Sequence, residues 1–320
     1  TWGAYQCYGD PFYVLKKIRK DSAQSKSNLA DAEEAVTELS NFLNGIDVAG
    51  MRAANTEALL KKVREWENTV EKFYSDGRVT ELIADAYAKA GDLKTAVIRY
   101  ERLFQLEVAN YSVRALEQCL NLRARLLSEQ TDFQAGDVNR EEIVSKVNGY
   151  IQEIEVINRI HPTSERLSLI GSAYKRAFLM LRSPDYLKKT EKAYFDSLQY
   201  YQTNPGSSPN MYYPFFNWAT AYALLEVAGH KPSKRKQPSA ADVERALAEA
   251  TGLDEGKPDF WNKTAPSMGY AYQLIKASEP AEIERLIEQL ADNFREAWVK
   301  EGNESNRKSH LDQFRFIIHA

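Results

Sequence analysis

The segment over residues 81–104 has the pattern of two short amphipathic helices joined by a tight turn. Small side chains, Ala84 and Ala96, stand where two antiparallel helices must approach each other. Large ones, Tyr87 and Tyr100, follow them by three and four residues and fill the space between the backbones. A glycine–aspartate pair between the two halves supplies the turn. A chain built around such a hairpin is expected to bury its apolar faces helix against helix.

This order of residues resembles the tetratricopeptide repeat, a helix–turn–helix unit of about 34 residues. The resemblance runs without a gap over about 22 residues, and Val108 stands where the repeat usually closes with proline. An ordinary amphipathic helical hairpin has the same pattern and is the alternative to a true repeat. We expect the repeat.

A second, looser copy of the hairpin covers residues 169–178 and 189–201, with glycine in the small position. The two tyrosines that mark the first copy are at positions 87 and 100, whereas their counterparts here are Tyr174 and Tyr194. The larger spacing predicts a hairpin loop, around residues 182–184, that is longer by about seven residues.

Helical periodicity extends over most of the chain, and the breakers Gly (15) and Pro (11) are few among the 320 residues. Besides the two hairpins, helices are expected at about 22–43, 53–75, 112–129, 140–159, 215–229, 240–251, 258–277, 280–299 and 305–319. Sequential hairpins bury their faces only against their neighbours. The sequence therefore predicts an all-α fold, a tetratricopeptide-like α-solenoid of about twelve helices, as one domain over residues 21–320.

Residues 1–20 differ from the rest, because their first half is aromatic and carries Gly3, Gly9 and Pro11. This composition predicts a short strand-like arm that ends in a turn. A single strand cannot satisfy its own edges. The arm is therefore expected either to close a sheet that begins upstream or to pack on the helices.

Two stretches in the second half resemble the TRAFs-binding domain, a relative of the tetratricopeptide repeats. They are YYPFFNWATAYALLEVAG (212–229) and DFWNKTAPSMGYAYQLI (259–275). The matching features are Tyr213-Pro214, Asn217 and Ala219, and Trp261, whereas Trp218 stands where a small residue is expected. The resemblance spans roughly residues 80–300 and implies a helical-repeat region with a regulatory or scaffold role.

The first eleven residues, TWGAYQCYGDP, resemble the closing strand of CHAT domains, the caspase-like cysteine proteases of bacteria. The catalytic His and Cys of that family would lie upstream, outside this sequence. The resemblance implies that the helical repeats follow a protease domain in a protein of bacterial defence or conflict signalling.

Composition excludes several function classes. Lys and Arg number 42 against 45 Asp and Glu, so the chain lacks the basic excess of a general nucleic-acid binder. The sequence contains no run of 18 apolar residues that would predict a membrane span, and no secretion signal is visible in it. Two cysteines do not make a disulfide scaffold and suit a reducing compartment, which predicts a cytoplasmic location.

No motif for catalysis, metal binding or cofactor binding is present. Cys119 lies on the apolar face of a helix, and Cys7 lies in the aromatic arm, where packing explains both. The four histidines are scattered, with no spacing typical of a metal site, and no phosphate loop occurs. The chain is therefore predicted to need no metal or cofactor and to be no enzyme itself; an independent enzyme using Cys7 or Cys119 is the least favoured alternative.

Repeat arrays bind partners on the concave face that the first helix of each hairpin lines. In the first hairpin this face is predicted to hold Arg78, Glu81, Asp85, Ala88 and Lys89. In the second hairpin it is predicted to hold Glu165, Ser168, Ser172, Lys175 and Arg176. The acids at 81 and 85 stand where carboxylate-clamping repeats carry Lys and Asn, so a mixed groove for a folded protein or a charged peptide is expected.

One basic loop between two predicted helices is a second candidate contact, for an acidic partner or a phosphate; it contains Lys231, Lys234, Arg235 and Lys236. A solvated loop with no function is the alternative.

The predicted function is binding. The first hypothesis is a regulatory repeat region of a larger CHAT-type protease, whose groove recognises a protein that controls or targets the protease. The alternative is a stand-alone scaffold that assembles signalling proteins, with no protease attached.

Overall fold

The computed structural model of the chain describes residues 29–318 except 49–55, 109, 132–138, 205–210, 233–235, 253–259 and 302–303. Within these ranges the chain forms thirteen α-helices, one short 3₁₀ helix and no strand. The helices are α1 (Ala32–Val48), α2 (Thr56–Val70), η2 (Glu71–Phe73), α3 (Gly77–Lys89), α4 (Leu93–Leu103), α5 (Val113–Gln130), α6 (Arg140–Ile160), α7 (Ser164–Leu181), α8 (Pro184–Thr203), α9 (Tyr212–Val227), α10 (Ala240–Gly252), α11 (Phe260–Lys276), α12 (Pro280–Glu301) and α13 (Glu304–Ile318). The arm predicted over residues 1–20 lies outside the described residues.

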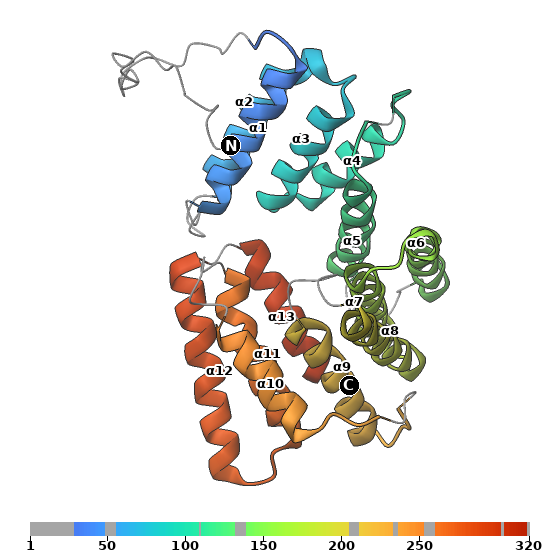
Figure 1. The fold of residues 1–320 in the computed structure, drawn as a ribbon, viewed down its shortest axis with the longest axis vertical. Helices are drawn as coiled ribbons and strands as arrows, with labels where there is room; N and C mark the ends of the chain where they lie inside the picture. Colours follow the sequence, from blue (N-terminus) through green and yellow to red (C-terminus); the bar gives the residue numbers. More distant parts are fainter. Residues whose placement is uncertain are drawn as a thin grey trace, which may run out of the picture.

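Every helix from α3 to α11 packs on the next helix in sequence (Figure 1). In addition, α1 packs on α3, α5 on α7, and α9 on α11. Contacts that are confined to near neighbours are the pattern of a solenoid of helical hairpins. The predicted all-α, tetratricopeptide-like solenoid is confirmed.

The α3–α4 hairpin has the geometry that its sequence predicts. The turn between the helices contains Gly91 at φ 85°, a conformation that favours glycine. Asp92 then caps α4, because its carboxylate accepts a hydrogen bond from the backbone N–H of Thr95 at 3.0 Å. The small residues Ala84 and Ala96 are fully buried where the two helices cross.

The α7–α8 hairpin corrects the predicted long loop. Only Arg182 and Ser183 separate the two helices, and Arg182 makes the turn in the left-handed conformation at φ 53°. The additional residues lengthen the helices instead, to 18 and 20 residues compared with 13 and 11 in the α3–α4 hairpin. An added Cβ on Gly171 would lie 2.8 Å from the ring of Tyr194, so this glycine marks the close approach of the two helices.

One predicted helix boundary is wrong. The helix α1 continues past residue 43 to Val48, and the extension buries Ile46 beside Leu43 in the same core. The helix α11 contains Pro266 in its interior and agrees with the helix predicted over 258–277.

The core forms three consecutive apolar clusters that share helices. The first spans α1 to α5, the second α5 to α9 together with Phe316 of α13, and the third α8 to α11. The helix α9 is buried on nearly all sides, and its Trp218 packs between the rings of Phe195 and Phe215 at centroid distances of 5.2 and 5.8 Å. The large residue at position 218 is therefore a central part of the core.

The last helix, α13, does not simply extend the row. It lies against both α7 and α11 (Figure 1). The ring of Phe316 meets Phe178 of α7 edge-on at 5.6 Å, and His310 is 3.1 Å from the hydroxyl of Ser267 on α11. The C-terminal helix is thereby brought back onto the middle of the chain.

Candidate binding site around helix α7

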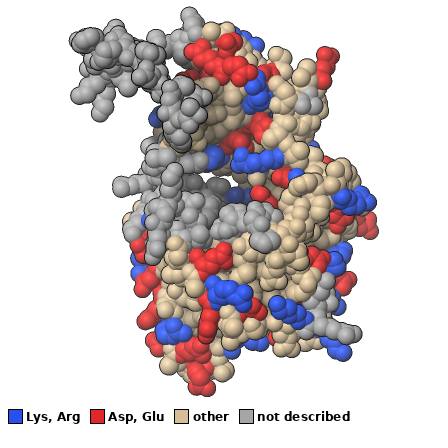
Figure 2. Space-filling view, viewed as in Figure 1, with Lys and Arg blue, Asp and Glu red and all other residues tan. Residues whose placement is uncertain are grey.

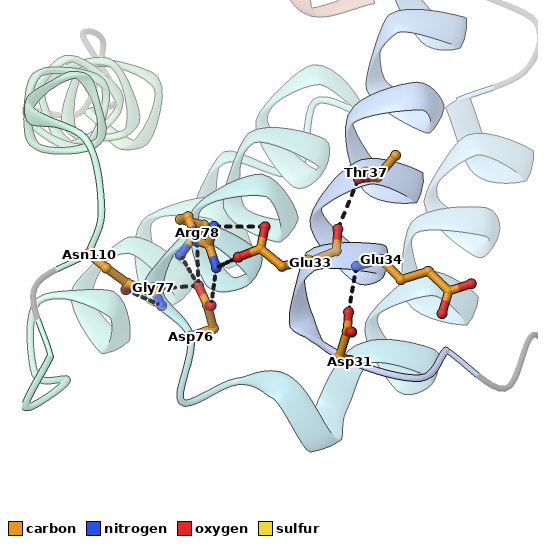
Figure 3. A network of polar contacts seen from close by, with 8 residues as sticks. All are labelled: Asp31, Glu33, Glu34, Thr37, Asp76, Gly77, Arg78 and Asn110. Atoms are coloured by element: carbon orange, nitrogen blue, oxygen red, sulfur yellow. Dashed lines mark hydrogen bonds and ion pairs between the residues drawn. The ribbon is translucent and has the colours of Figure 1, made fainter.

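The first of the predicted groove residues, Arg78, holds two helices together. Its guanidinium lies 2.7 Å from the carboxylate of Glu33 on α1 and 2.7 Å from that of Asp76, the cap of α3 (Figure 3). Asn110 completes this network, accepting from the backbone N–H of Gly77 at 2.7 Å and donating to Asp76 at 3.0 Å. The Arg78 side chain is thus already neutralised by carboxylates of the chain.

The acids of the same helix are also engaged within the chain. The carboxylate of Glu81 accepts hydrogen bonds from the backbone N–H of Ser112, at 2.8 Å, and from its hydroxyl. Asp85 accepts from the hydroxyl of Tyr100, and burial raises the pKa of Asp85 above its usual range. Lys89 is partly exposed near the end of α3. The structure does not assemble these residues into one open site.

The five candidates on α7 lie in three different places. Glu165 is exposed at the start of the helix. Ser168 is buried and faces α8, where its hydroxyl is 2.9 Å from that of Ser197. Ser172, Lys175 and Arg176 lie together one and two turns further on; Ser172 accepts a hydrogen bond from the Arg176 guanidinium at 2.6 Å.

Lys175 is held by residues from two other helices. Its Nζ donates to Oδ1 of Asn217 on α9 at 3.1 Å and to Oε1 of Gln313 on α13 at 2.6 Å. The ammonium also lies 5.6 Å from the centroid of the Phe316 ring. Burial, together with the neighbouring charge of Arg176, lowers the pKa of Lys175 to about 7.

Arg176 points from the same turn toward α5. Its Nη1 donates to Oδ1 of Asn121 at 3.3 Å as well as to Ser172. Its Nε is buried and has no hydrogen-bond partner among the described residues, and the same is true of Nε2 of Gln313. Burial lowers the pKa of Arg176 as well, an effect that Asp312 of α13 opposes.

Neither cation has a carboxylate within ion-pair distance in the part of the chain that the structure describes. The carboxylate of Asp312 is near enough to favour the charged form of both cations, but it forms its ion pair with Arg315, at 3.3 Å. Arg125, which also faces Arg176, is paired with Glu129 at 3.0 Å. The cluster therefore carries excess positive charge in a poorly hydrated place.

The space-filling view shows that the molecule is hollowed near its middle, with Lys and Arg side chains at the rim of the hollow (Figure 2). In the ribbon view, α13 lies at this level, between α11 and α7 (Figure 1).

The basic loop forms no comparable site within the described residues. Lys231 is exposed, and the Nζ of Lys236 is 3.9 Å from Asp242 of α10 and half-exposed. Lys234 and Arg235 lie outside the described residues, so their role remains a prediction.

Cys119 is fully buried in the first core cluster, and burial raises the pKa of its thiol to about 12. A thiol in this state is a poor nucleophile. Cys7 lies outside the described residues. Within the described ranges, His, Cys, Asp and Glu form no group of three that could hold a metal ion, and no helix there combines the length and apolar character needed to cross a bilayer.

Comparison with known proteins gives one match. The family described as Tetratricopeptide Repeats-Sensor (TPR-S) matches residues 109–222, about a third of the chain, from α5 to most of α9. No curated protein and no solved structure matches the chain. The chain thus contains a tetratricopeptide-like helical repeat region, a type of region that generally binds protein partners.

The sequence predicts the two cations of this candidate site but not the residues that surround them. No sequence pattern links Asn121 or Gln313 to these cations, because Asn121 is 55 positions from Arg176 and Gln313 is 138 positions from Lys175. In the sequence, Asn217 stands out only through the resemblance to the TRAFs-binding domain. Only the return of α13 onto α7 shows that these amides belong to one site.

Proposed function

We propose that this chain is the interaction and regulatory region of a larger protein and acts in the cytoplasm by binding a protein partner on the inner face of its solenoid. The observation that carries the proposal is the tetratricopeptide-like repeat fold, together with the TPR-S match over residues 109–222. Extended concave surfaces are how such arrays bind. The word "sensor" in the name of that family agrees with a regulatory role.

The larger protein is proposed to be a CHAT-type cysteine protease of bacterial defence or conflict signalling. The support for this step is the resemblance of residues 1–11 to the closing strand of CHAT domains. In this arrangement the protease precedes the repeats, and partner binding by the repeats controls or targets cleavage. The TRAFs-binding resemblance over roughly residues 80–300 agrees with a regulatory repeat region.

The alternative is a scaffold that assembles signalling proteins without a protease. The two hypotheses differ in the covalent context of residues 1–20, and intact mass spectrometry of the protein purified from its native host separates them. A species much larger than 36.5 kDa that contains these peptides supports the protease arrangement when its additional sequence carries a His and a Cys in an α/β domain. A mature species of about this mass without such a domain contradicts the protease hypothesis and favours the scaffold.

The partner-binding step has its own test. The protein captured from the host should be lost when residues of the inner face are changed, for example by Glu165→Lys at the exposed start of α7. A matched change on the outer helix α8, Asp196→Lys, should leave it bound. Equal capture by both variants would contradict binding on the inner face of α7.

A further inference from the structure

Two adjacent cations in a poorly hydrated site are the least balanced feature of the described residues. Lys175 and Arg176 are partly buried and have no ion-pair partner there, although cations withdrawn from water are normally paired with an anion. Two arginines elsewhere do have such a partner: the buried Arg166 is paired with Glu117, and the partly buried Arg99 with Glu67. An anion from outside the chain would balance the charges.

We propose that the inner face of α7 binds a phosphate group of a small molecule between Lys175 and Arg176, with Ser172 and Gln313 as further contacts. The site is not assigned by the family match, and it does not depend on which protein partner the solenoid binds.

The hydrogen-bond donors without a partner in the site indicate which kind of ligand it would bind. The two buried atoms without a partner, Nε of Arg176 and Nε2 of Gln313, are both donors. A ligand that satisfies them must offer acceptors, and phosphate oxygens are acceptors with up to two negative charges for the two cations. Arginine's planar fork can take two such oxygens at once, and lysine adds a point charge.

The enclosure of the site limits the size of the ligand. Helix α13 lies against α7 beside Lys175. Its Gln313 accepts a hydrogen bond from the ammonium of Lys175 and donates none to any residue that the structure describes. The ring of Phe316 covers the same ammonium. Because α13 packs on α7 at this point, the proposed ligand is a compact phosphate-bearing molecule and not an extended polypeptide.

Isothermal titration calorimetry with inorganic pyrophosphate and orthophosphate, at low ionic strength and pH 6.5, tests the site. The wild-type chain is expected to bind pyrophosphate at one site. Lys175→Gln and Arg176→Gln should each weaken binding by about tenfold or more, since one charge-assisted hydrogen bond is lost and each contributes about 1.5–3 kcal/mol. Glutamine keeps an amide donor for the neighbouring groups, so the fold should be retained, as circular dichroism would verify.

The matched control is Lys192→Gln, which removes one positive charge from the exposed face of α8, where Lys192 pairs with Asp196 at 2.7 Å. Its affinity for pyrophosphate should equal that of the wild type. Three outcomes overturn the proposal: no binding at millimolar pyrophosphate, equal weakening by all three substitutions, or tight binding of a phosphoserine peptide with none of the free phosphates. If Arg176→Gln fails to fold, Lys175→Gln still decides the question.

Discussion

The close approach of α7 and α8 at Gly171 makes a quantitative prediction. In Gly171→Ala, the new Cβ would lie 2.8 Å from two carbons of the Tyr194 ring and 3.0 Å from a third. The ring is completely buried, so it has no open space into which to rotate. Either the ring or the helix must move, and over-packing of this kind costs about 1–3 kcal/mol.

The same substitution also has a favourable effect, because alanine is better than glycine inside a helix by about 1 kcal/mol. The net expectation for Gly171→Ala is a loss of about 1 kcal/mol in the free energy of unfolding. The control is Gly149→Ala, in the middle of α6, where an added Cβ meets nothing within 4 Å. That variant should be stabilised by about 1 kcal/mol.

Urea denaturation followed by circular dichroism measures both variants against the wild type. The two denaturation midpoints should move in opposite directions. Both variants gain the same helix propensity, so the difference between their midpoints reports the contact with Tyr194. A rise of the Gly171→Ala midpoint equal to that of Gly149→Ala would refute the argument, since it would mean that α7 and α8 do not approach closely at Tyr194.

Three further predictions concern buried polar and titratable groups. Arg166→Met should reduce the free energy of unfolding by about 3–5 kcal/mol, because it leaves the buried carboxylate of Glu117 unpaired; urea denaturation would measure it. Alkylation of Cys119 at pH 8 should be slow in the native protein and complete in urea, as peptide mass spectrometry would show, because the thiol is buried and its pKa is raised to about 12. In the folded chain the pKa of Lys175 is about 7, below its ordinary value in an unfolded chain. Between about pH 7 and 10 the unfolded chain therefore binds a proton that the folded chain lacks. Unfolding free energy should therefore rise with pH across this window, and Lys175→Gln should flatten the rise in a Tm series.

The fold was predictable because local patterns decide it. In a solenoid each hairpin is stabilised by its neighbours in sequence, so helical period and small–large alternation carry most of the information. Ala84 and Tyr100 could be assigned to their buried positions without any long-range contact. The loop of the second hairpin was mispredicted because the spacing of Tyr174 and Tyr194 does not say whether added residues extend a loop or the helices.

The candidate site is only partly predictable from the sequence, because the residues that form it are far apart along the chain. Periodicity predicts that Lys175, Arg176 and Ser168 share one face of a helix, whereas in the structure the hydroxyl of Ser168 faces α8. The position of α13, which brings Gln313 to Lys175, depends on tertiary packing far along the chain. No local pattern encodes such a return.

The central claim about the site is that the cations of α7 bind an anion from outside the chain. A crystal structure of the chain grown with pyrophosphate tests this claim most directly, because it locates the anion. The account predicts density between the ammonium of Lys175 and the guanidinium of Arg176, within hydrogen-bond distance of Gln313. Density only at exposed lysines or at the basic loop, with the α7 site empty, would contradict it.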